Sequence, residues 1–251
     1  MLLNPGHFCW CETVTRDPAG SARFYGELLG WQAREESMGP LGAHTLFSRD
    51  GRDVAGASAM TAAPPLPGAG AYWLSHILCE DVERLSEAAA DLGARVATPP
   101  TTIPGVGRLA ILWDPRGAPF ALWQGAGDAR PWPRLPGYPC WFELNTGTPE
   151  VAAFYCALLG WRLETRRYDR DYSVFFKGDT AVASVAVLPP GTAVADHWLP
   201  FFAVSGCGAV ISRATDLGAS VRLPATLVPG LGRYGVIADP FEATFAVKQN
   251  L

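Results

Sequence analysis

The chain has 251 residues, of which 49% are hydrophobic and 18% charged, and its 20 Lys and Arg against 24 Asp and Glu give a net charge of −4 at pH 7. Because no block of like charges occurs, binding to nucleic acid or to an anionic membrane is not expected. No apolar run approaches the ~20 residues of a membrane span and no signal peptide is recognisable, so we expect a cytoplasmic protein with reduced cysteines.

The first predicted segment consists of a strand, a helix and further strands. An apolar strand over residues 8–14 precedes Asp17-Pro18, which is typical of a helix N-cap followed by proline at the first helical position. The helix is expected to end at Gly30, which suits a left-handed C-terminal residue. Short alternating runs over 43–48 and 53–59 indicate strands.

The same order of elements restarts near residue 71. A strand is predicted over residues 72–79, and Asp81 is expected to cap a helix that runs through Leu92, with Gly93 after it. Further strand candidates follow at 95–96, 109–113 and 120–123. The repeating unit is therefore strand-helix-strand-strand-strand.

The second half of the chain repeats the first. Cys9-Trp10-Cys11-Glu12 corresponds to Cys140-Trp141-Phe142-Glu143, and residues 24–31 correspond to residues 154–161. Residues 125–137 are too rich in Pro and Gly for a regular element, which indicates a linker. We therefore predict one domain over 1–124, a linker over 125–137 and a second domain over 138–251.

These motifs resemble those of a known family. Phe-Tyr-x-x-Leu-Leu-Gly-Trp on the first helix, Leu-Gly-Ala after the second, Pro-Gly-x-Gly-Arg before a strand and Asp-Pro before the last strand are similar to the vicinal oxygen chelate superfamily of glyoxalase I, bleomycin-resistance proteins and extradiol dioxygenases. The resemblance implies an α+β fold with two tandem domains. Each would be a pair of βαβββ units that form a cupped eight-stranded mixed sheet with the helices outside.

The resemblance also implies where a metal would be bound. Metal-dependent members carry ligands on the first, fifth and eighth strands of each domain. The residues at these positions are Trp10, Leu74 and Ala121 in the first half, and Trp141, Leu199 and Ala246 in the second. Neither triple offers imidazole, carboxylate or thiolate groups, so we expect a metal-independent protein without a cofactor.

Strand alternation indicates which other side chains face each cup. The predicted ligand-binding residues are Trp10, Tyr72, His76, Trp123, Trp141, His197 and Phe201. Glu12 and Glu143 are candidate general bases, because burial in an apolar cup raises the pKa of a carboxyl group. The alternatives are that the glutamates bind backbone N–H groups or a linker arginine, that the histidines are satisfied or partly exposed, and that the tryptophans fill the core.

Two functions follow from this set. The first is a protein that binds a planar aromatic or polyketide-like small molecule, with an accessory, sequestration or resistance role in secondary metabolism. The second is a metal-free lyase, isomerase or hydrolase that acts on a carbonyl or epoxide and uses Glu12 or Glu143 as general base. One cavity could instead be filled by its own side chains. A monomer and a homodimer both fit the sequence.

Overall fold

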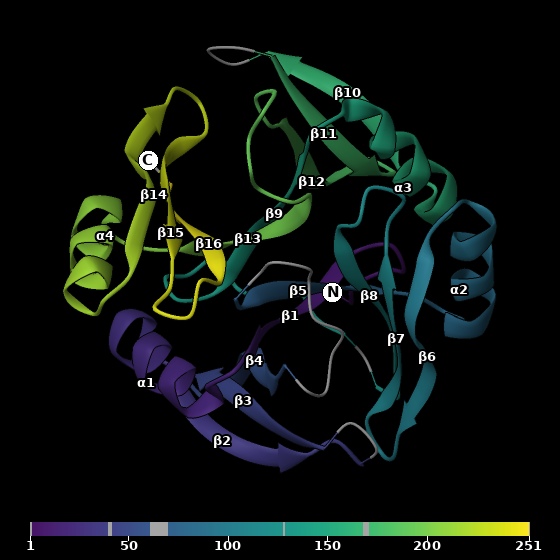
Figure 1. Ribbon diagram of the computed structural model, residues 1–251, viewed down its shortest axis with the longest axis horizontal. Helices are drawn as coiled ribbons and strands as arrows, with labels where there is room; N and C mark the ends of the chain where they lie inside the picture. Colours follow the sequence, from purple (N-terminus) through teal and green to yellow (C-terminus); the bar gives the residue numbers. More distant parts are fainter. Residues whose placement is uncertain (1, 40–41, 61–69, 128, 168–170, 251) are drawn as a thin grey trace. The chain divides into compact units, whose positions relative to one another are not determined.

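The computed structural model describes residues 2–39, 42–60, 70–127, 129–167 and 171–250. The first half contains β1 (Phe8–Thr15), α1 (Pro18–Leu29), β2 (Gln32–Ser37), β3 (Ala43–Arg49), β4 (Arg52–Ala59), β5 (Tyr72–Leu78), α2 (Val82–Asp91), β6 (Arg95–Ile103), β7 (Gly107–Trp113) and β8 (Pro119–Gly125), as labelled in Figure 1. None of the helices in the described part of the chain is long and apolar enough to cross a membrane.

The second half repeats this order. It contains β9 (Pro139–Thr146), the 3-10 turn η2 (Pro149–Val151), α3 (Ala152–Leu159), β10 (Arg162–Arg167), β11 (Asp171–Lys177), β12 (Thr180–Val187), β13 (His197–Ala203), α4 (Cys207–Asp216), β14 (Ser220–Val228), β15 (Gly232–Ala238) and β16 (Thr244–Gln249). The predicted repeat of four strand-helix-strand-strand-strand segments is therefore confirmed.

The helix boundaries follow the capping signals of the sequence. Asp17 accepts a hydrogen bond from the backbone N–H of Gly20 at 2.8 Å, and proline follows it at the start of α1. Gly30 ends α1 in the left-handed conformation with φ of 72°, and Gly160 ends α3 in the same way. Thr148 makes no side-chain capping bond, and α3 is preceded by the 3-10 turn instead.

The strands form two eight-stranded mixed sheets. Their strand orders are β2-β3-β4-β1-β5-β8-β7-β6 and β10-β11-β12-β9-β13-β16-β15-β14. The pairs β1–β4 and β5–β8 are parallel, and consecutive strands after each helix form antiparallel hairpins. This arrangement confirms the α+β class and the mixed eight-stranded sheets.

Two features of the strands differ from the sequence prediction. Strand β2 was not identified separately, and β6 is longer than the predicted residues 95–96 and runs through Pro99 and Pro100. Proline cannot donate a ladder hydrogen bond, but β6 lies at a sheet edge and its register with β7 shifts between Thr98 and Thr101. The edge position and the bulge explain how the prolines are accommodated.

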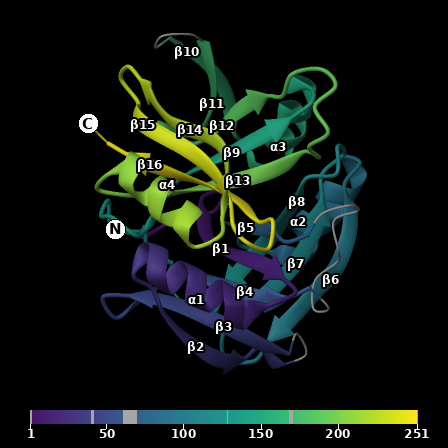
Figure 2. The same ribbon diagram turned by 60° about the vertical axis from the view of Figure 1, so that its left-hand side comes forward.

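The chain divides into two compact units. One unit contains residues 1–10, 74–131 and 142–199, and the other contains residues 11–73, 132–141 and 200–251. Each unit thus contains one βαβββ segment from each half of the chain. Helices α2 and α3 lie side by side in the first of these, and α1 and α4 lie side by side in the second, as Figures 1 and 2 show. The predicted domain boundaries follow the sequence repeat and stay a prediction.

An equivalent buried network occurs in each unit. The Tyr25 hydroxyl donates to Oδ2 of Asp239 at 2.8 Å and accepts a hydrogen bond from Nε1 of Trp73 at 3.2 Å. In the other unit, the Tyr155 hydroxyl donates to Asp114 at 2.9 Å and accepts from Trp198 at 2.9 Å. The polar atoms of these tyrosine and tryptophan side chains can be buried without a large cost, because each of them has a hydrogen-bond partner. These tryptophans therefore belong to the core.

Candidate functional site

A buried polar cluster surrounds Glu12 on β1. Glu12 is 7% exposed, and its Oε1 accepts a hydrogen bond from the Ser58 hydroxyl on β4 at 3.2 Å. Nε2 of His44 on β3 lies 3.3 Å from Oε2 of Glu12. A buried carboxylate is costly unless polar groups compensate it, and here two neighbouring strands supply them. The cluster thus joins a carboxylate, an imidazole and a hydroxyl.

The backbone at Gly56 makes room for this imidazole. A Cβ atom at residue 56 would lie 2.3 Å from Nε2 of His44 and 3.3 Å from the carbonyl oxygen of Thr45. Gly56 is also the residue of β4 that stands opposite Glu12 in the parallel register. A side chain at this position is therefore incompatible with the observed place of the His44 ring.

Tyr72, the first residue of β5, belongs to the same compact unit as Glu12. Burial raises the pKa of its hydroxyl, and the negative charge of Glu12 raises it further. The Tyr72 hydroxyl consequently stays protonated at neutral pH, which makes it a hydrogen-bond donor. A role for Glu12 or Tyr72 in ligand binding stays a prediction.

The equivalent carboxylate in the second half has a different partner. Glu143 on β9 is half-buried, and its Oε2 accepts a hydrogen bond from the Ser184 hydroxyl on β12 at 2.9 Å. Ser184 stands directly opposite Glu143 in the parallel register of β9 and β12. It therefore holds the position that Gly56 holds in the first half. The two glutamates share a strand position but differ in their surroundings.

The remaining predicted residues fall into both units. His76 is buried on β5, where it stands opposite Ala121, and Trp123 is half-buried on β8, both in the unit of Glu143. Phe201 is buried on β13 in the unit of Glu12, and its ring centroid lies 5.8 Å from that of Tyr234. The contribution of these side chains to ligand binding stays a prediction.

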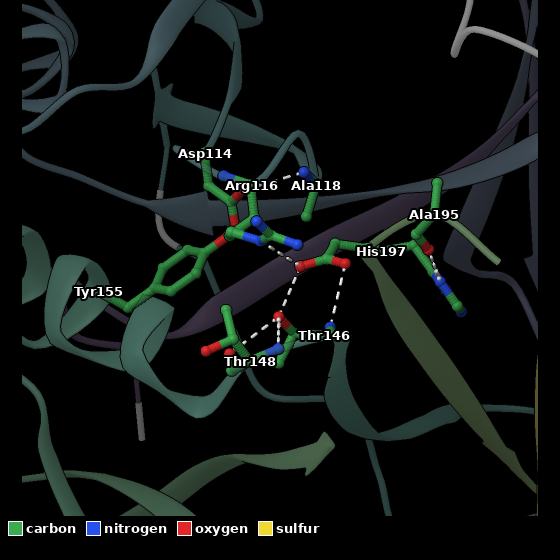
Figure 3. Close-up of polar contacts among 10 residues, drawn as sticks. Asp114, Arg116, Ala118, Thr146, Thr148, Tyr155, Ala195 and His197 are labelled. Carbon is green, nitrogen blue, oxygen red and sulfur yellow. Dashed lines mark hydrogen bonds and ion pairs between the residues drawn. The ribbon is translucent and has the colours of Figure 1, made fainter. Parts of the chain in front are cut away.

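His197 at the start of β13 is half-buried. Its Nδ1 lies 2.8 Å from the carbonyl oxygen of Ala195, a contact drawn in Figure 3. Burial lowers the pKa of His197, so the imidazole is mainly neutral at pH 7. The preceding residue, Asp196, accepts a hydrogen bond from the Thr146 hydroxyl and lies 3.5 Å from Nε of Arg116. The loop before β13 is thus tied to β9.

The tryptophans at the first-strand positions are placed differently from those of the core. Trp10 and Trp141 are both half-buried, whereas Trp73 and Trp198 are almost completely buried. Half-burial leaves part of each ring available for contact with another molecule. A stacking role for these two residues stays a prediction.

The donor set at the implied metal positions does not fit a divalent ion. Leu74 and Ala121 have no donor atoms and are fully buried, and the indole nitrogen of Trp10 is a hydrogen-bond donor only. Among the described residues, no three His, Cys, Asp or Glu side chains gather as metal ligands. We therefore derive no chemical step through a metal.

Sequence reasoning missed His44, Ser58 and Ser184. The resemblance directed attention to the first, fifth and eighth strands, whereas His44 lies on β3 and the serines lie on β4 and β12. The sequence carried one signal, because His44 lies within the alternating run over 43–48 that predicts a strand. To predict that His44 lies near Glu12, one would also need the register of β1, β4 and β3.

Comparisons with known proteins agree with the fold and the repeat. A model of the Glyoxalase/Bleomycin resistance protein/Dioxygenase superfamily matches residues 7–122 and 144–247. Anthracycline biosynthesis protein DnrV of Streptomyces peucetius is 34% identical over 98% of this chain and 94% of its own. Putative glyoxylase CFP32 of Mycobacterium bovis is 29% identical over 95% and 92%.

A solved structure is similar over most of the chain. The Mn(II)-bound glyoxalase from Novosphingobium aromaticivorans superimposes with a TM-score of 0.66 over 98% of this chain and 82% of its own, at 13% sequence identity. An identity this low shows the shared fold and carries no statement about ligands or chemistry.

Proposed function

Because the chain belongs to the Glyoxalase/Bleomycin resistance protein/Dioxygenase superfamily, we propose that it binds a planar aromatic, polyketide-like small molecule without a metal ion. Relatives that match almost the whole chain are named anthracycline biosynthesis proteins, which supports a role in antibiotic metabolism. That role is accessory, or one of sequestration or resistance.

The observation that carries this proposal is the polar cluster around Glu12. A small-molecule site is mostly apolar and aromatic, with a few polar groups that fix the orientation of the ligand. Glu12 on β1, His44 on β3 and the protonated hydroxyl of Tyr72 on β5 supply both acceptors and donors. Trp10 on β1 is half-buried and offers part of an aromatic ring for stacking, at a position where metal-dependent relatives carry a ligand.

Quenching of tryptophan fluorescence by 1,8-dihydroxyanthraquinone tests the proposal. This probe is planar, polycyclic and carries hydroxyl and carbonyl groups. We expect saturable quenching with about one or two molecules bound per chain, unchanged after dialysis against EDTA. Trp10→Phe should weaken the binding, whereas the same substitution at Trp132, which lies outside the strands, serves as the matched control. Quenching that requires an added metal ion, or no quenching by any planar aromatic probe, contradicts the proposal.

A second candidate function is a metal-free lyase, isomerase or hydrolase that uses a glutamate as general base. The specific observation in its favour is the contact of 3.3 Å between His44 and Glu12, because paired carboxylate and imidazole groups are suited to proton transfer. Comparison of turnover by Glu12→Gln and Glu143→Gln with that of the parent tests this candidate. Full activity in both variants would remove the proposed base.

A further inference from the structure

One buried polar side chain in the second half of the chain lacks a hydrogen bond. Asn145 on β9 is 9% exposed, and its Nδ2 is buried without a hydrogen-bond partner in the described part of the chain. Nearly all buried polar groups in proteins have a partner, because an unpartnered one lowers stability. The first half has Val14 at the equivalent position of β1, so the fold does not require an amide here. Asn145 thus carries a donor that the fold itself leaves unused.

The imidazole of His197 presents a hydrogen-bond acceptor. Its Nδ1 lies 2.8 Å from the carbonyl oxygen of Ala195, and a carbonyl oxygen can only accept, so Nδ1 carries the proton. Burial lowers the pKa of His197, so the ring is mainly neutral at pH 7 and Nε2 has an unprotonated lone pair. No hydrogen bond to Nε2 occurs among the residues that the structure describes. Nε2 is therefore available to accept a hydrogen bond from a bound molecule.

His197 points away from helix α3. The next residue, Trp198, donates a hydrogen bond at 2.9 Å to the hydroxyl of Tyr155 on α3, so Trp198 lies on the α3 side of its strand. Successive side chains of a strand point to opposite faces of the sheet. The imidazole of His197 therefore lies on the face that α3 does not cover.

Asn145 lies on this same face. The ring centroid of Phe175 on β11 is 6.2 Å from that of the tyrosine on α3, so Phe175 and the opposite residue of β12, Ala183, belong to the α3 side. The next residue of β12, Ser184, lies on the other face, together with Glu143, to which it donates a hydrogen bond. Asn145 is two residues beyond Glu143 on β9 and shares its face.

Contacts of the neighbouring residues place Asn145 beside His197. The Thr146 hydroxyl donates to Oδ2 of Asp196 at 2.5 Å, as Figure 3 shows, and the backbone N–H of Gly147 donates to Oδ1 at 3.1 Å. The end of β9 thus lies against the start of β13, its neighbour in the sheet. Asn145 precedes Thr146 and His197 follows Asp196, both on the opposite face. Side chains that stand opposite each other on paired strands have their Cβ atoms about 5 Å apart.

This pair joins a donor and an acceptor on one face of one compact unit. The Asn145 amide can donate to a carbonyl oxygen, and Nε2 of His197 can accept from a hydroxyl group. A ligand with both groups on neighbouring atoms satisfies both side chains at once. The first half has Val14 and Tyr72 at the two equivalent positions, and the valine offers no hydrogen bond. The two halves of the chain therefore differ in the edge of a ligand that they can recognise.

We propose that the second half of the chain binds an aromatic molecule that carries a carbonyl group and a hydroxyl group on neighbouring ring positions, held by Asn145 and His197. The inference rests on the proposed binding function and names the ligand chemistry of a separate site. In this site the amide of Asn145 donates to the carbonyl oxygen, and the hydroxyl group donates to Nε2 of His197. Both side chains bind the molecule, and neither takes part in a chemical step.

Equilibrium dialysis of the full chain against two planar probes tests the site. The probe 1-hydroxy-9-fluorenone carries a carbonyl and a neighbouring hydroxyl group, whereas 9-fluorenone carries the carbonyl alone. We expect the parent to bind the hydroxylated probe about 5–10-fold more tightly. Asn145→Leu should weaken the binding of both probes by about 5–10-fold, because the amide contacts the carbonyl. His197→Phe should weaken only the hydroxylated probe, so that the preference disappears.

Two exposed or distant residues provide matched controls. In His7→Phe the same substitution removes an imidazole whose Nδ1 lies 2.9 Å from the carbonyl oxygen of Asn4. In Asn250→Leu the same substitution removes an exposed amide beyond β16. Both controls should bind the two probes like the parent. Equal losses in His7→Phe and His197→Phe would overturn the assignment to His197.

Thermal unfolding without ligand gives a readout that a structural asparagine would move in the opposite direction. Leucine has nearly the shape of asparagine and removes a buried amide that lacks a partner, so Asn145→Leu should raise Tm by about 2–6 °C. A lower Tm would show that the fold uses the amide, which overturns the inference. A higher Tm with unchanged affinity for both probes would show that the amide binds only water, with the same consequence.

The outcomes separate this inference from the proposed function. If 1,8-dihydroxyanthraquinone quenches the parent but Asn145→Leu and His197→Phe keep the affinity and the preference of the parent, the second-half site is wrong and the binding function stands. If no planar aromatic probe quenches, the binding function itself fails, and the site fails with it.

Discussion

The Asp239 carboxyl group is expected to make the stability of the protein depend on pH. Asp239 is 2% exposed, and burial raises its pKa from an ordinary value of 3.8 to about 6, even though Tyr25 and two backbone N–H groups donate hydrogen bonds to it. The folded protein thus holds the proton more tightly than the unfolded chain. The stabilising contribution is fully present below pH 3.8 and is lost as the pH rises through about 6.

The magnitude follows from the two pKa values. The difference between 3.8 and 6, at 1.36 kcal/mol per pH unit, gives about 3 kcal/mol. In Asp239→Asn the amide oxygen can accept the two backbone bonds and the amide nitrogen can donate to Tyr25, at a cost that does not depend on pH. The difference between the free energies of unfolding, variant minus parent, should therefore rise by about 2–3 kcal/mol between pH 4 and pH 7.

Urea unfolding of both proteins, followed by circular dichroism at several pH values in this range, measures the effect. Subtraction of the two curves cancels the titration of all other groups. Asp50→Asn, at a side chain that is 75% exposed, is the matched control for the substitution itself. A difference between variant and parent that is flat, or that falls as the pH rises, would refute the reasoning.

Three further substitutions test other parts of the structure. Gly56→Ala should lower the free energy of unfolding in urea by about 1–3 kcal/mol, because its Cβ would clash with Nε2 of His44. The loss should largely vanish when His44 is also replaced by Ala, and an equal loss with and without His44 would contradict the contact. Trp198→Phe, which removes the indole donor to Tyr155, should cost about 2–3 kcal/mol in the same assay, and a cost below about 0.5 would show that the bond is dispensable. Gly160→Ala, at φ of 63°, should lower the stability by about 1 kcal/mol, measured as a decrease in Tm, and an unchanged Tm would argue against the left-handed C-cap.

Most elements of the fold could be predicted because their signals are local. Asp17-Pro18 and Gly30 delimit a helix through bonds and dihedral angles within a few residues of each other. The internal repeat then extended each assignment to the second half. The extended course of β6 through Pro99 and Pro100 could not be predicted in this way, because proline is tolerated there only by virtue of an edge position and a bulge.

The candidate site was predicted in part. Glu12 and Tyr72 were selected by strand alternation, and both lie in one unit, where the charge of Glu12 acts on the Tyr72 hydroxyl. His44 was not selected, because it is 32 residues from Glu12 in the sequence and reaches it only through β4, which pairs with both strands. A glycine at position 56 of the sequence does not by itself indicate that a histidine of the neighbouring strand lies against it.

The sequence by itself determined the number and order of the βαβββ segments, both ends of α1 and the family, since each of these rests on residues close together in the chain or on a repeated motif. Only the tertiary structure decided what surrounds each glutamate. Glu12 and Glu143 occupy the same place in the repeat and each accepts a hydrogen bond from a serine hydroxyl, yet an imidazole lies beside Glu12 as well. The physical reason is that the partners of Glu12 come from β3 and β4, which are distant from β1 in the sequence. Only the register of these strands places the His44 ring beside Glu12, in the space that a side chain at residue 56 would occupy.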